Sequence, residues 1–592
     1  MSPMGDHAER LAALRRHIAA LALDGVIVPH ADEFLGEAAP PSSQRLAWLT
    51  GFTGSAGIAV VLAHRAAVFS DGRYVLQLAQ QTDAALWEQR HVIDDPPPAW
   101  LASHAPGGRI GYDPKLIAAD GLARFTAAGL EMVPIETDPV DAIWSDRPPS
   151  PAAPIVLHPL ELAGKASAEK REEIATALRK ANQDAAVLTD PASVAWLLNL
   201  RGADLPNTPF ALAFAILRAD GSVDLFADAA RIAPDLRESF GNAVSVRPPD
   251  ELAAALDALA GKRVRVDPAA SPVWFSQRLR AAGADVVAEP DPCALPKARK
   301  NLAEQYGMRV AHARDAIAVC RFLHGLDRHA HLGTETELSA AAQLLALRAE
   351  LPGFRGESFP AISGAGEHGA IIHYRATEAS DRTLHPDELY LIDSGGQYPD
   401  GTTDITRTVW TGRGTAPASV RADVTRVLKG HIAIATLVFP RGVAGPHIDA
   451  FARRALWDAG LDYDHGTGHG VGSYLSVHEG PASISRNARP IPLEIGMVLS
   501  NEPGLYRPGA YGIRLENLLL VEEASNAGDR PWLRFATLTL APFDRRLIDP
   551  GLLDPAERAW VDAYHARVLA EIGPTLPPDD RPWLAAACAL LA

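Results

Sequence analysis

The sequence has little of what secreted, membrane-spanning or nucleic-acid-binding proteins need. Its 592 residues include three cysteines, an odd number, which argues against a disulfide framework and favours a reducing compartment. The opening string MSPMGDHAERL lacks the apolar core of a secretion signal, and no run of about 18 apolar residues indicates a membrane span. The net charge of -16 argues against nucleic acid or an anionic membrane as the main partner. We therefore expect a cytoplasmic protein.

What the sequence does contain is typical of a multidomain globular protein. A chain of this length is too long for one hydrophobic core, and its hydrophobic and charged fractions are an ordinary 47% and 22%. Two Pro-rich segments, RPPSPAAPIV at 147–156 and EPDPCALPKARKN at 289–301, are candidate linkers. They predict three domains, over residues 1–150, 151–296 and 297–592.

The first two predicted domains share an order of sequence signals. In the first domain, the apolar string at 24–28 is followed by a Trp-Leu segment at 48–49 and by two further strand signals. The second domain has the same series, which begins with an apolar string at 184–188 and a Trp-Leu segment at 196–197. Helical stretches lie between these signals, so both domains are predicted to be α/β. The shared order indicates either a common origin or only the general pattern of α/β domains.

The third predicted domain opens with two helices. Steps of four and three predict the buried face of a long first helix, made of Tyr306, Val310, Ala313, Ile317 and Cys320. The string TETE at 334–337 has the pattern of a capping box, which would open a second helix over SAAAQLLALRAEL. Beyond it, strands alternate with Gly-rich turns, and this part holds the motifs that carry chemistry.

Five side chains in this last part are candidate metal ligands. The strings LIDSGG, TTDITRT, HGTGHGVG, SNEPG and IRLEN contain, in order, Asp393, Asp404, His469, Glu502 and Glu516. If they converge, their four carboxylates require about two divalent cations for neutrality, and oxygen donors with one imidazole suit Mn²⁺, Co²⁺, Fe²⁺ or Zn²⁺ rather than a thiolate-binding metal. Two such ions can share a hydroxide that attacks a carbonyl carbon. The pattern therefore predicts a two-metal hydrolase.

Local structure supports part of this set. Asp393 ends the apolar string LYLI, Asp404 begins TDITRTVW, and turn residues lie between them at 399–401. An antiparallel hairpin would place the two carboxylates opposite each other, with Cβ atoms about 4.5–5.5 Å apart, where they repel unless they are protonated or bind metal. The alternative is a pair of solvated loop aspartates.

The other candidates are weaker when taken singly. The glycines around His469 permit a close backbone approach to a ligand, although they are also typical of a plain turn. Glu502 and Glu516, each taken alone, have the alternative of a surface glutamate. Arg514 is predicted to share a strand and a face with Glu516, because alternate residues of a strand point the same way. The fixed order of the five strings favours the ligand interpretation.

These strings resemble the aminopeptidase P (Xaa-Pro aminopeptidase) branch of the pita-bread metallopeptidases. The resemblance rests on LIDSGGQYPDGTTDITRT, GTGHGVG, HEGP, SNEPG and GIRLEN, and extends to SVAWLLNLRGADLPNTP, FSDGRYVLQL, SFPAISGAGEHGAIIHYRA and LTLAPFDRRLIDP. It implies the long, three-domain form: two creatinase-like N-terminal α/β domains and a C-terminal pita-bread catalytic domain, of α/β (α+β) class. It also implies two divalent metal ions, most simply Mn²⁺ with Zn²⁺ or Co²⁺ as alternatives, and a homodimer.

The resemblance further implies an activity and residue roles. The enzyme would release the N-terminal residue from peptides with proline in the second position, by attack of a hydroxide that bridges the two metals. Glu502 would pass the proton as well as bind metal, His373 would flank the scissile bond, and His478 would hydrogen-bond the substrate carbonyl. The proline side would be lined by His465 and Tyr506.

Two arginines complete the expected site. Arg514 would brace the ligand network from outside it. Arg73 follows Ser70-Asp71-Gly72 at the end of a predicted strand; the resemblance implies that it reaches the far end of the peptide, and the alternative is a surface arginine that caps its turn.

Other functions fit less well. A prolidase shares the five ligands but acts on Xaa-Pro dipeptides, and the extra N-terminal domain favours the aminopeptidase. Creatinase lacks the metal ligands. A metal-free peptide- or histone-binding relative would have lost ligands that are all present here.

Overall fold

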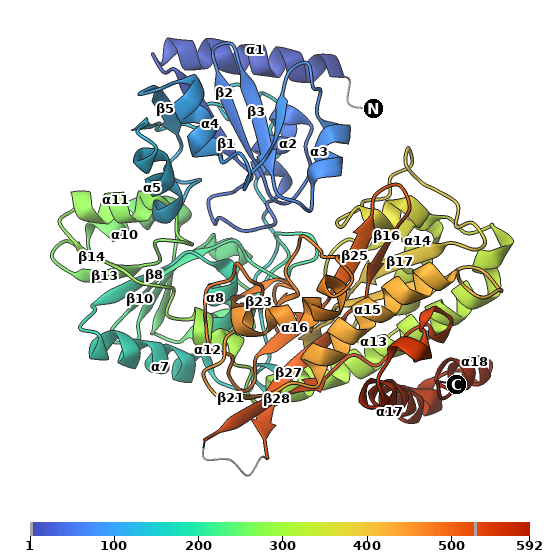
Figure 1. Cartoon of the computed structure of the whole chain (residues 1–592). Helices are drawn as coiled ribbons and strands as arrows, with labels where there is room; N and C mark the ends of the chain where they lie inside the picture. The colour runs from blue at the N-terminus through green and yellow to red at the C-terminus, as the bar shows by residue number, and fades with distance from the viewer. Residues whose placement is uncertain (1–3, 526–529, 592) are drawn as a thin grey trace. The chain divides into compact units, whose positions relative to one another are not determined.

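The computed structural model describes residues 4–525 and 530–591 (Figure 1), so the first three residues of the N-terminal string lie outside the described part. The chain forms two compact units. One comprises Met1–Leu160 with Lys165–Ala294, and the other comprises Glu161–Gly164 with Leu295–Ala592. Among the described helices, none is both long enough and apolar enough to cross a membrane.

The first unit begins with a six-stranded sheet in the order β4-β3-β2-β1-β5-β6. The two pairings around β2 are antiparallel and the other three are parallel. The strands are β1 (Gly25–Pro29), β2 (Ile58–Leu62), β3 (Ala66–Ser70), β4 (Glu88–His91), β5 (Arg109–Tyr112) and β6 (Glu131–Pro134). The helices between and around them are α1 (Met4–Ala20), α2 (Arg45–Thr50), α3 (Val75–Gln81), α4 (Pro97–His104) and α5 (Ala119–Ala127).

The second sheet of this unit repeats the first. Its order is β12-β11-β10-β8-β13-β14, and its central pairings β8–β10 and β10–β11 are antiparallel while the outer three are parallel. The strands are β8 (Ala185–Leu188), β10 (Phe214–Arg218), β11 (Val223–Phe226), β12 (Val244–Arg247), β13 (Arg263–Val266) and β14 (Asp285–Ala288). The helices are α7 (Ser167–Lys180), α8 (Pro191–Leu198), α9 (Pro234–Phe240), α10 (Leu252–Asp257) and α11 (Val273–Ala281). The order of elements predicted from the sequence is therefore present twice.

The second unit is built from helices packed on several small sheets. Two of its sheets have the orders β16-β17-β20 and β21-β28-β27-β24-β22-β23, in which β21 is Val438–Pro440. The strands used below are β16 (Ile362–Ala365), β17 (Leu389–Ser394), β18 (Gly396–Tyr398), β19 (Gly401–Thr402), β20 (Ile405–Trp410), β22 (Gly468–Gly470), β23 (Glu479–Ile484), β24 (Val498–Asn501), β25 (Gly504–Arg507), β26 (Tyr511–Arg514), β27 (Asn517–Ala524) and β28 (Trp532–Thr537). The helices are α12 (Ala294–Ala298), α13 (Leu302–His329), α14 (Glu337–Ala349), α15 (Ala418–Ala435), α16 (Gly445–Trp457), α17 (Pro555–Ile572) and α18 (Arg581–Ala587).

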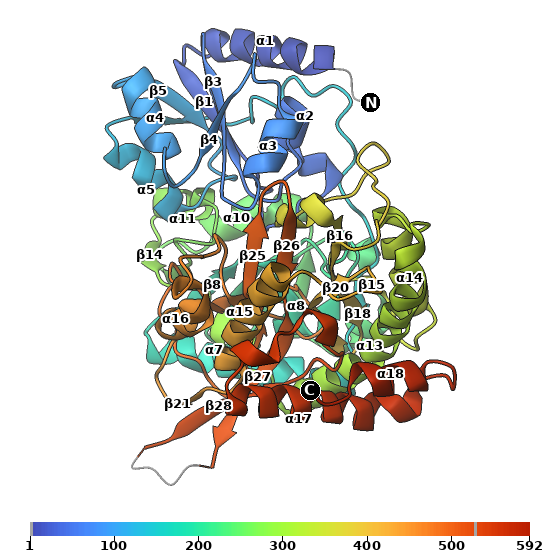
Figure 2. The ribbon, with the colours of Figure 1, turned by 45° about the vertical axis from the view of Figure 1, so that its right-hand side comes forward.

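The C-terminal helices α17 and α18 lie beside α13 in both views (Figures 1 and 2). The predicted buried face of α13 is present only in part. Cys320 is fully buried and Ile317 packs against the core, whereas Tyr306 is 71% exposed and Met308 is buried instead. The reason at this end of the helix is a close contact. A Cβ atom on Gly307 would lie 2.3 Å from the carbonyl oxygen of Asp400, so the helix approaches the 399–401 turn through its small residues.

The capping box of α14 is present but lies two residues later than predicted. Thr336 is the N-cap: its Oγ1 accepts from the Ser339 amide at 3.1 Å, and Ser339 Oγ accepts from the Thr336 amide at 2.8 Å. The N3 position is thus a serine. The side chain of Glu337 takes no part in the cap and is fully buried instead.

Candidate metal centre

The hairpin that was predicted to pair two aspartates has a different register. In the antiparallel ladder of β17 and β20, Asp393 faces Thr406, and Asp404 lies just before β20. The prediction that Asp393 faces Asp404 is therefore wrong by two positions. The intervening chain forms its own hairpin, β18 with β19, in which Gln397 faces Thr402, and this second hairpin takes up residues that a simple turn would leave in the ladder.

Four of the five candidate ligands nevertheless converge. One ligand atom each from Asp404, His469 and Glu516 lie within 4.8 Å of one another. His469 Nε2 is 3.5 Å from Asp404 Oδ2 and 3.4 Å from Glu502 Oε1. His469 lies in β22, and Glu502 directly follows β24. Asp404 directly precedes β20, and Glu516 directly precedes β27.

The fifth candidate, Asp393, joins this group through hydrogen bonds. Arg514 Nη2 donates to Asp393 Oδ2 at 2.6 Å and Arg514 Nε donates to Thr406 Oγ1 at 3.3 Å. Thr406 Oγ1 in turn donates to Glu516 Oε2 at 2.7 Å. Sequence reasoning overlooked Thr406, although it lies two residues after Asp404, the spacing at which strand residues share a face.

The glycines beside His469 are needed for the packing of β22 between its neighbours. A Cβ atom on Gly468 would lie 1.9 Å from the carbonyl oxygen of Ser500, and one on Gly470 would lie 2.1 Å from that of Glu479. The close approach that the sequence predicted is thus to adjacent strands. His469 Nδ1 donates to the Gly470 carbonyl at 2.9 Å, which leaves Nε2 available as a metal ligand.

The charges of this group are poorly balanced without cations. Burial and the neighbouring carboxylates Asp404 and Glu502 raise the pKa of Glu516, and burial likewise raises the pKa values of Asp393 and Glu502. Burial lowers the pKa of His469, but Asp404 and Glu502 outweigh it and raise the pKa to about 9. A cation bound here would balance these charges and compete with protons for the carboxylates.

Two carboxylate oxygens in the group fit metal ligation directly. Asp393 Oδ1 and Glu516 Oε1 are buried, and neither has a hydrogen-bond partner among residues 4–525 and 530–591. A buried, unpaired carboxylate oxygen is costly, and coordination of a cation is one of the few ways to compensate it. Four carboxylates with one imidazole are also a suitable donor set for Mn²⁺-like ions. The residues present therefore fit a pair of divalent ions.

The residues predicted to line the proline side belong to a chain of hydrogen bonds that ends at the candidate metal ligand Asp393. Tyr506 OH donates to His465 Nε2 at 2.8 Å and accepts from Arg514 Nη1 at 2.8 Å. Because Arg514 also binds Asp393, the chain runs from His465 to the ligand group. The bracing contact expected of Arg514 is present, whereas contact of His465 and Tyr506 with substrate stays a prediction.

Arg514 and Glu516 are not in one strand, contrary to the prediction. Strand β26 ends at Arg514 and β27 begins at Asn517. The chain changes sheet here, since β26 pairs with β25 and β27 pairs with β24 and β28. The two residues between the strands are held by hydrogen bonds of the Leu515 amide to the Pro503 carbonyl and of the Glu516 amide to the Thr406 carbonyl.

The two predicted catalytic histidines lie in different parts of the second unit. The ring of His478 packs almost perpendicular to that of His469, with centroids 4.3 Å apart, so it borders the ligand group. His373 is half-buried on the turn that follows the short helix η5 (Gly366–Ala370). Its place beside a substrate stays a prediction.

The segment after His478 contains a buried charge cluster that sequence reasoning overlooked. Glu479 accepts from Lys297 Nζ at 3.2 Å and also from Lys300 Nζ, and all three side chains are buried. The partners are about 180 residues apart in the chain, so no local pattern could reveal the cluster.

Arg73 lies in the first unit and is held by its own turn. Its Nε and Nη2 donate to the two carboxylate oxygens of Asp71 at 2.9 and 2.8 Å, and its guanidinium lies 5.3 Å from the centre of the Tyr74 ring. These contacts agree with the alternative of a turn-capping arginine. The substrate contact stays a prediction.

Comparison with protein families identifies the class of protein. The model of metallopeptidase family M24 matches residues 306–523, and that of the C-terminal region of peptidase M24 matches 531–591. Two models of the creatinase/prolidase N-terminal domain match 10–143 and 146–304. Fold, domain matches and converging carboxylates together define a metallopeptidase of family M24, a hydrolase. The predicted creatinase-like and pita-bread fold is confirmed.

Individual relatives narrow this class. Xaa-Pro aminopeptidase 2 of Sus scrofa is 38% identical over 96% of this chain and 86% of its own length, and aminopeptidase P2 of Arabidopsis thaliana has the same identity and coverage. The crystal structure of X-prolyl aminopeptidase from Caenorhabditis elegans, described as a cytosolic enzyme with a di-nuclear active site, superimposes with a TM-score of 0.93 over 99% of both chains, at 34% identity. The chain belongs to the Xaa-Pro aminopeptidase family.

Proposed function

We propose that this enzyme removes the N-terminal residue from peptides with proline in the second position, with two divalent metal ions held by Asp393, Asp404, His469, Glu502 and Glu516. The observation that carries the proposal is the convergence of carboxylates on His469. Glu516 in this group and Asp393 beside Arg514 each have an unpaired buried oxygen, and the chain is related to Xaa-Pro aminopeptidases over nearly its full length.

The residues divide the work as follows. Divalent ions held by the five ligands would lower the pKa of a bound water toward neutrality and act as a Lewis acid on the scissile carbonyl. Glu502, whose pKa is raised by burial, accepts the proton of the attacking water and passes it to the leaving nitrogen. His478, packed on His469, donates a hydrogen bond to the carbonyl oxygen as charge develops there. His373 flanks the scissile bond.

Specificity for proline follows from the chemistry of the bond. An Xaa-Pro peptide has no N–H and a fixed ring, so its site must supply an apolar slot and cannot depend on that donor. His465 and Tyr506 form one wall of this slot in our proposal. They are fixed by their mutual hydrogen bond and by the one that Tyr506 accepts from Arg514. Arg73 is proposed to contact the far end of longer peptides.

Several further properties belong to the same proposal. The metal is Mn²⁺, with Zn²⁺ or Co²⁺ as substitutes, because the donor set suits all three. The enzyme is a cytoplasmic homodimer; the Caenorhabditis elegans relative is described as cytosolic. The domains extend over 1–150, 151–296 and 297–592, the first two being creatinase-like and the third catalytic.

Peptide hydrolysis tests the activity. With Mn²⁺ supplied, Arg-Pro-Pro should lose its first residue, and Arg-Ala-Pro should be cleaved with a kcat/KM lower by about 10-fold or more, because lost methylene groups weaken binding in an apolar slot. The dipeptide Arg-Pro serves as the comparison for a prolidase. Equal rates on the two tripeptides would contradict the proline slot, and cleavage of the dipeptide alone would identify a prolidase.

A further inference from the structure

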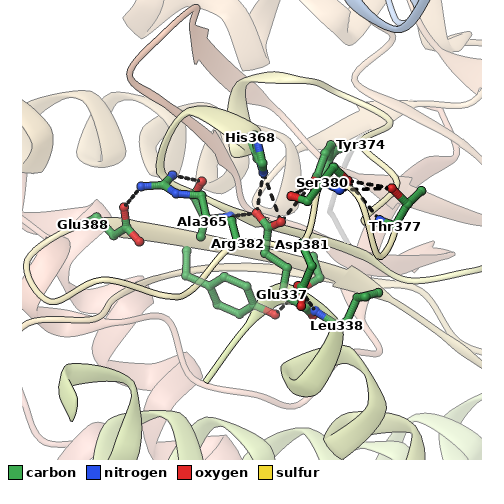
Figure 3. A network of polar contacts seen from close by, with 12 residues as sticks. Glu337, Leu338, Ala365, His368, Tyr374, Thr377, Ser380, Asp381, Arg382 and Glu388 are labelled. Carbon is green, nitrogen blue, oxygen red and sulfur yellow. Dashed lines mark hydrogen bonds and ion pairs between the residues drawn. The ribbon is translucent and has the colours of Figure 1, made fainter. Parts of the chain in front are cut away.

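The side chain of Glu337, at the first residue of α14, is a buried carboxylate outside the metal centre (Figure 3). Its Oε1 accepts from the Ala365 amide at 2.8 Å and from His368 Nδ1 at 2.9 Å, and its Oε2 accepts from Tyr374 OH at 2.8 Å. Both oxygens are thus satisfied by three donors. Burial of a carboxylate is tolerated only with such compensation.

These three donors belong to one short segment of chain. Ala365 ends β16, His368 lies in η5, and Tyr374 follows the next turn. The rings of His368 and Tyr374 also pack together, with centroids 4.5 Å apart. One carboxylate therefore ties both ends of the loop that carries His373. Figure 3 shows the contacts of Glu337 with His368 and Tyr374 as dashed lines.

The same segment packs on the strands that carry site residues. Tyr374 belongs to a small apolar cluster with Ile362 and Leu391. Leu391 lies two residues before Asp393 on β17, and Ile362 is the ladder partner of Asp393. The loop is therefore seated on β17, the strand that carries the proposed metal ligand Asp393.

A second contact fixes the segment on its other side. A Cβ atom on Gly512 would lie 1.7 Å from the carbonyl oxygen of Gly369, so η5 lies directly against β26. Arg514, which holds Asp393, ends that strand. The segment that carries His373 thus contacts both β17, which carries Asp393, and β26, which ends at Arg514.

Glu337 is itself rigidly held. Its amide donates to the Arg382 carbonyl at 2.9 Å, and its carbonyl accepts from Ser363 Oγ at 2.7 Å. Arg382 in turn donates to the Ala365 carbonyl at 2.5 Å and to Glu388 at 2.7 Å. An anchor with fixed backbone and fixed carboxylate can set the position of the loop to a fraction of an ångström, which is the precision that catalytic geometry needs.

We infer that Glu337 is a positioning residue for His373: its carboxylate, through His368 and Tyr374, fixes the loop so that the His373 imidazole stands at the scissile bond. The inference rests on the role of His373 in the proposed function. If Glu337 positions His373, its substitution lowers kcat only while His373 is present. A general loss of stability would lower activity whether or not His373 is present.

The test uses the full-length, Mn²⁺-loaded protein with Glu337→Gln, Tyr374→Phe and His373→Ala, alone and combined. Glu337→Gln keeps the shape of the side chain but removes its charge. Tyr374→Phe removes one of the three donors to the carboxylate, and this variant serves as the test if Glu337→Gln does not fold. Tyr112→Phe is the matched control, because its buried hydroxyl accepts from Gln277 Nε2 at 3.1 Å in the first unit and has no part in the Glu337 contacts.

We expect Glu337→Gln to lower kcat on Arg-Pro-Pro by about 10- to 100-fold, as displacement of a reacting group by about 1 Å does, with KM and metal content close to wild type. Tyr374→Phe should change kcat in the same direction, and Tyr112→Phe should leave it unchanged. In the His373→Ala background, Glu337→Gln should cause no further loss of kcat.

Three results would overturn the inference: wild-type kcat in Glu337→Gln, effects of Glu337→Gln and His373→Ala that multiply independently, or loss of metal as the cause of the defect. A wild-type kcat in His373→Ala would contradict the proposed role of His373 and therefore also the inference that Glu337 positions it. Absence of Xaa-Pro cleavage by the wild-type protein would instead count against the proposed function itself, so the two failures are distinguishable.

Discussion

Glu516→Gln should lower kcat/KM on Arg-Pro-Pro by about 10³-fold or more. A glutamine can still accept the hydrogen bond from Thr406. It lacks the negative charge and has an NH2 group in place of one carboxylate oxygen, and Oε1 of Glu516 is the oxygen without a hydrogen-bond partner. Metal ions stabilise the charge of the transition state by several kcal/mol, and about 1.4 kcal/mol corresponds to a tenfold change in rate. Asp404→Ala should have an effect of the same order, because its carboxylate lies in the same cluster.

The fold should survive Glu516→Gln. Burial and the adjacent carboxylates raise the pKa of Glu516, so its charged form is unfavourable in the metal-free protein, and a neutral amide relieves that repulsion. We expect a melting temperature at or above that of the metal-free wild type. Glu523→Gln, the same change at an exposed position of β27, is the control and should have full activity. A folded, metal-depleted Glu516→Gln enzyme with near-normal turnover would contradict the two-metal mechanism.

His478→Ala is expected to have the second-largest effect, a fall in kcat of about 10²–10³-fold with little change in KM. A donor aimed at the carbonyl oxygen is worth that much when its hydrogen bond strengthens as negative charge develops. The position is suitable, since the ring of His478 packs against the ligand His469. Steady-state kinetics on Arg-Pro-Pro at saturating Mn²⁺ would measure both constants.

The control for this variant is His385→Ala, which removes an exposed imidazole elsewhere in the same unit and should leave both constants unchanged. Metal analysis should find the same content in His478→Ala as in the wild type. If KM rises while kcat stays constant, His478 positions the substrate in the ground state, and the role assigned to it here is wrong.

The sequence predicted the fold well where local signals were complete. The strand at 24–28, the Trp-Leu segment and the strands that follow recur at 184–188 and beyond, and both series form sheets of the same order. Period-two alternation and apolar runs depend only on neighbouring residues. For that reason the repeated α/β architecture could be predicted without knowledge of distant contacts.

Errors arose where long-range contacts decide the local structure. The second hairpin, β18 with β19, shifts the register so that Asp393 faces Thr406. Strand β26 ends at Arg514 because the next residues bond to other segments. No signal within a short window specifies either event.

The site was predictable to a similar extent. Short strings were enough to select the candidate ligands, and the structure brings Asp404, His469 and Glu516 together; that they bind metal stays a prediction. The bracing of Asp393 by Arg514 followed from the resemblance and is present. The anchors Thr406 and Glu479 were overlooked because their partners are about 110 and 180 residues away, and Glu337 was assigned to a helix cap that Thr336 and Ser339 form instead.

Titration of metal-free protein with Mn²⁺, with bound metal and hydrolysis of Arg-Pro-Pro followed together, tests the central claim most directly. The account predicts no activity after chelation, binding of two equivalents per chain, and full activity only when both are bound, with Glu516→Gln failing to hold the full two equivalents. Full activity at one equivalent, or activity that persists in thoroughly chelated protein, would contradict it.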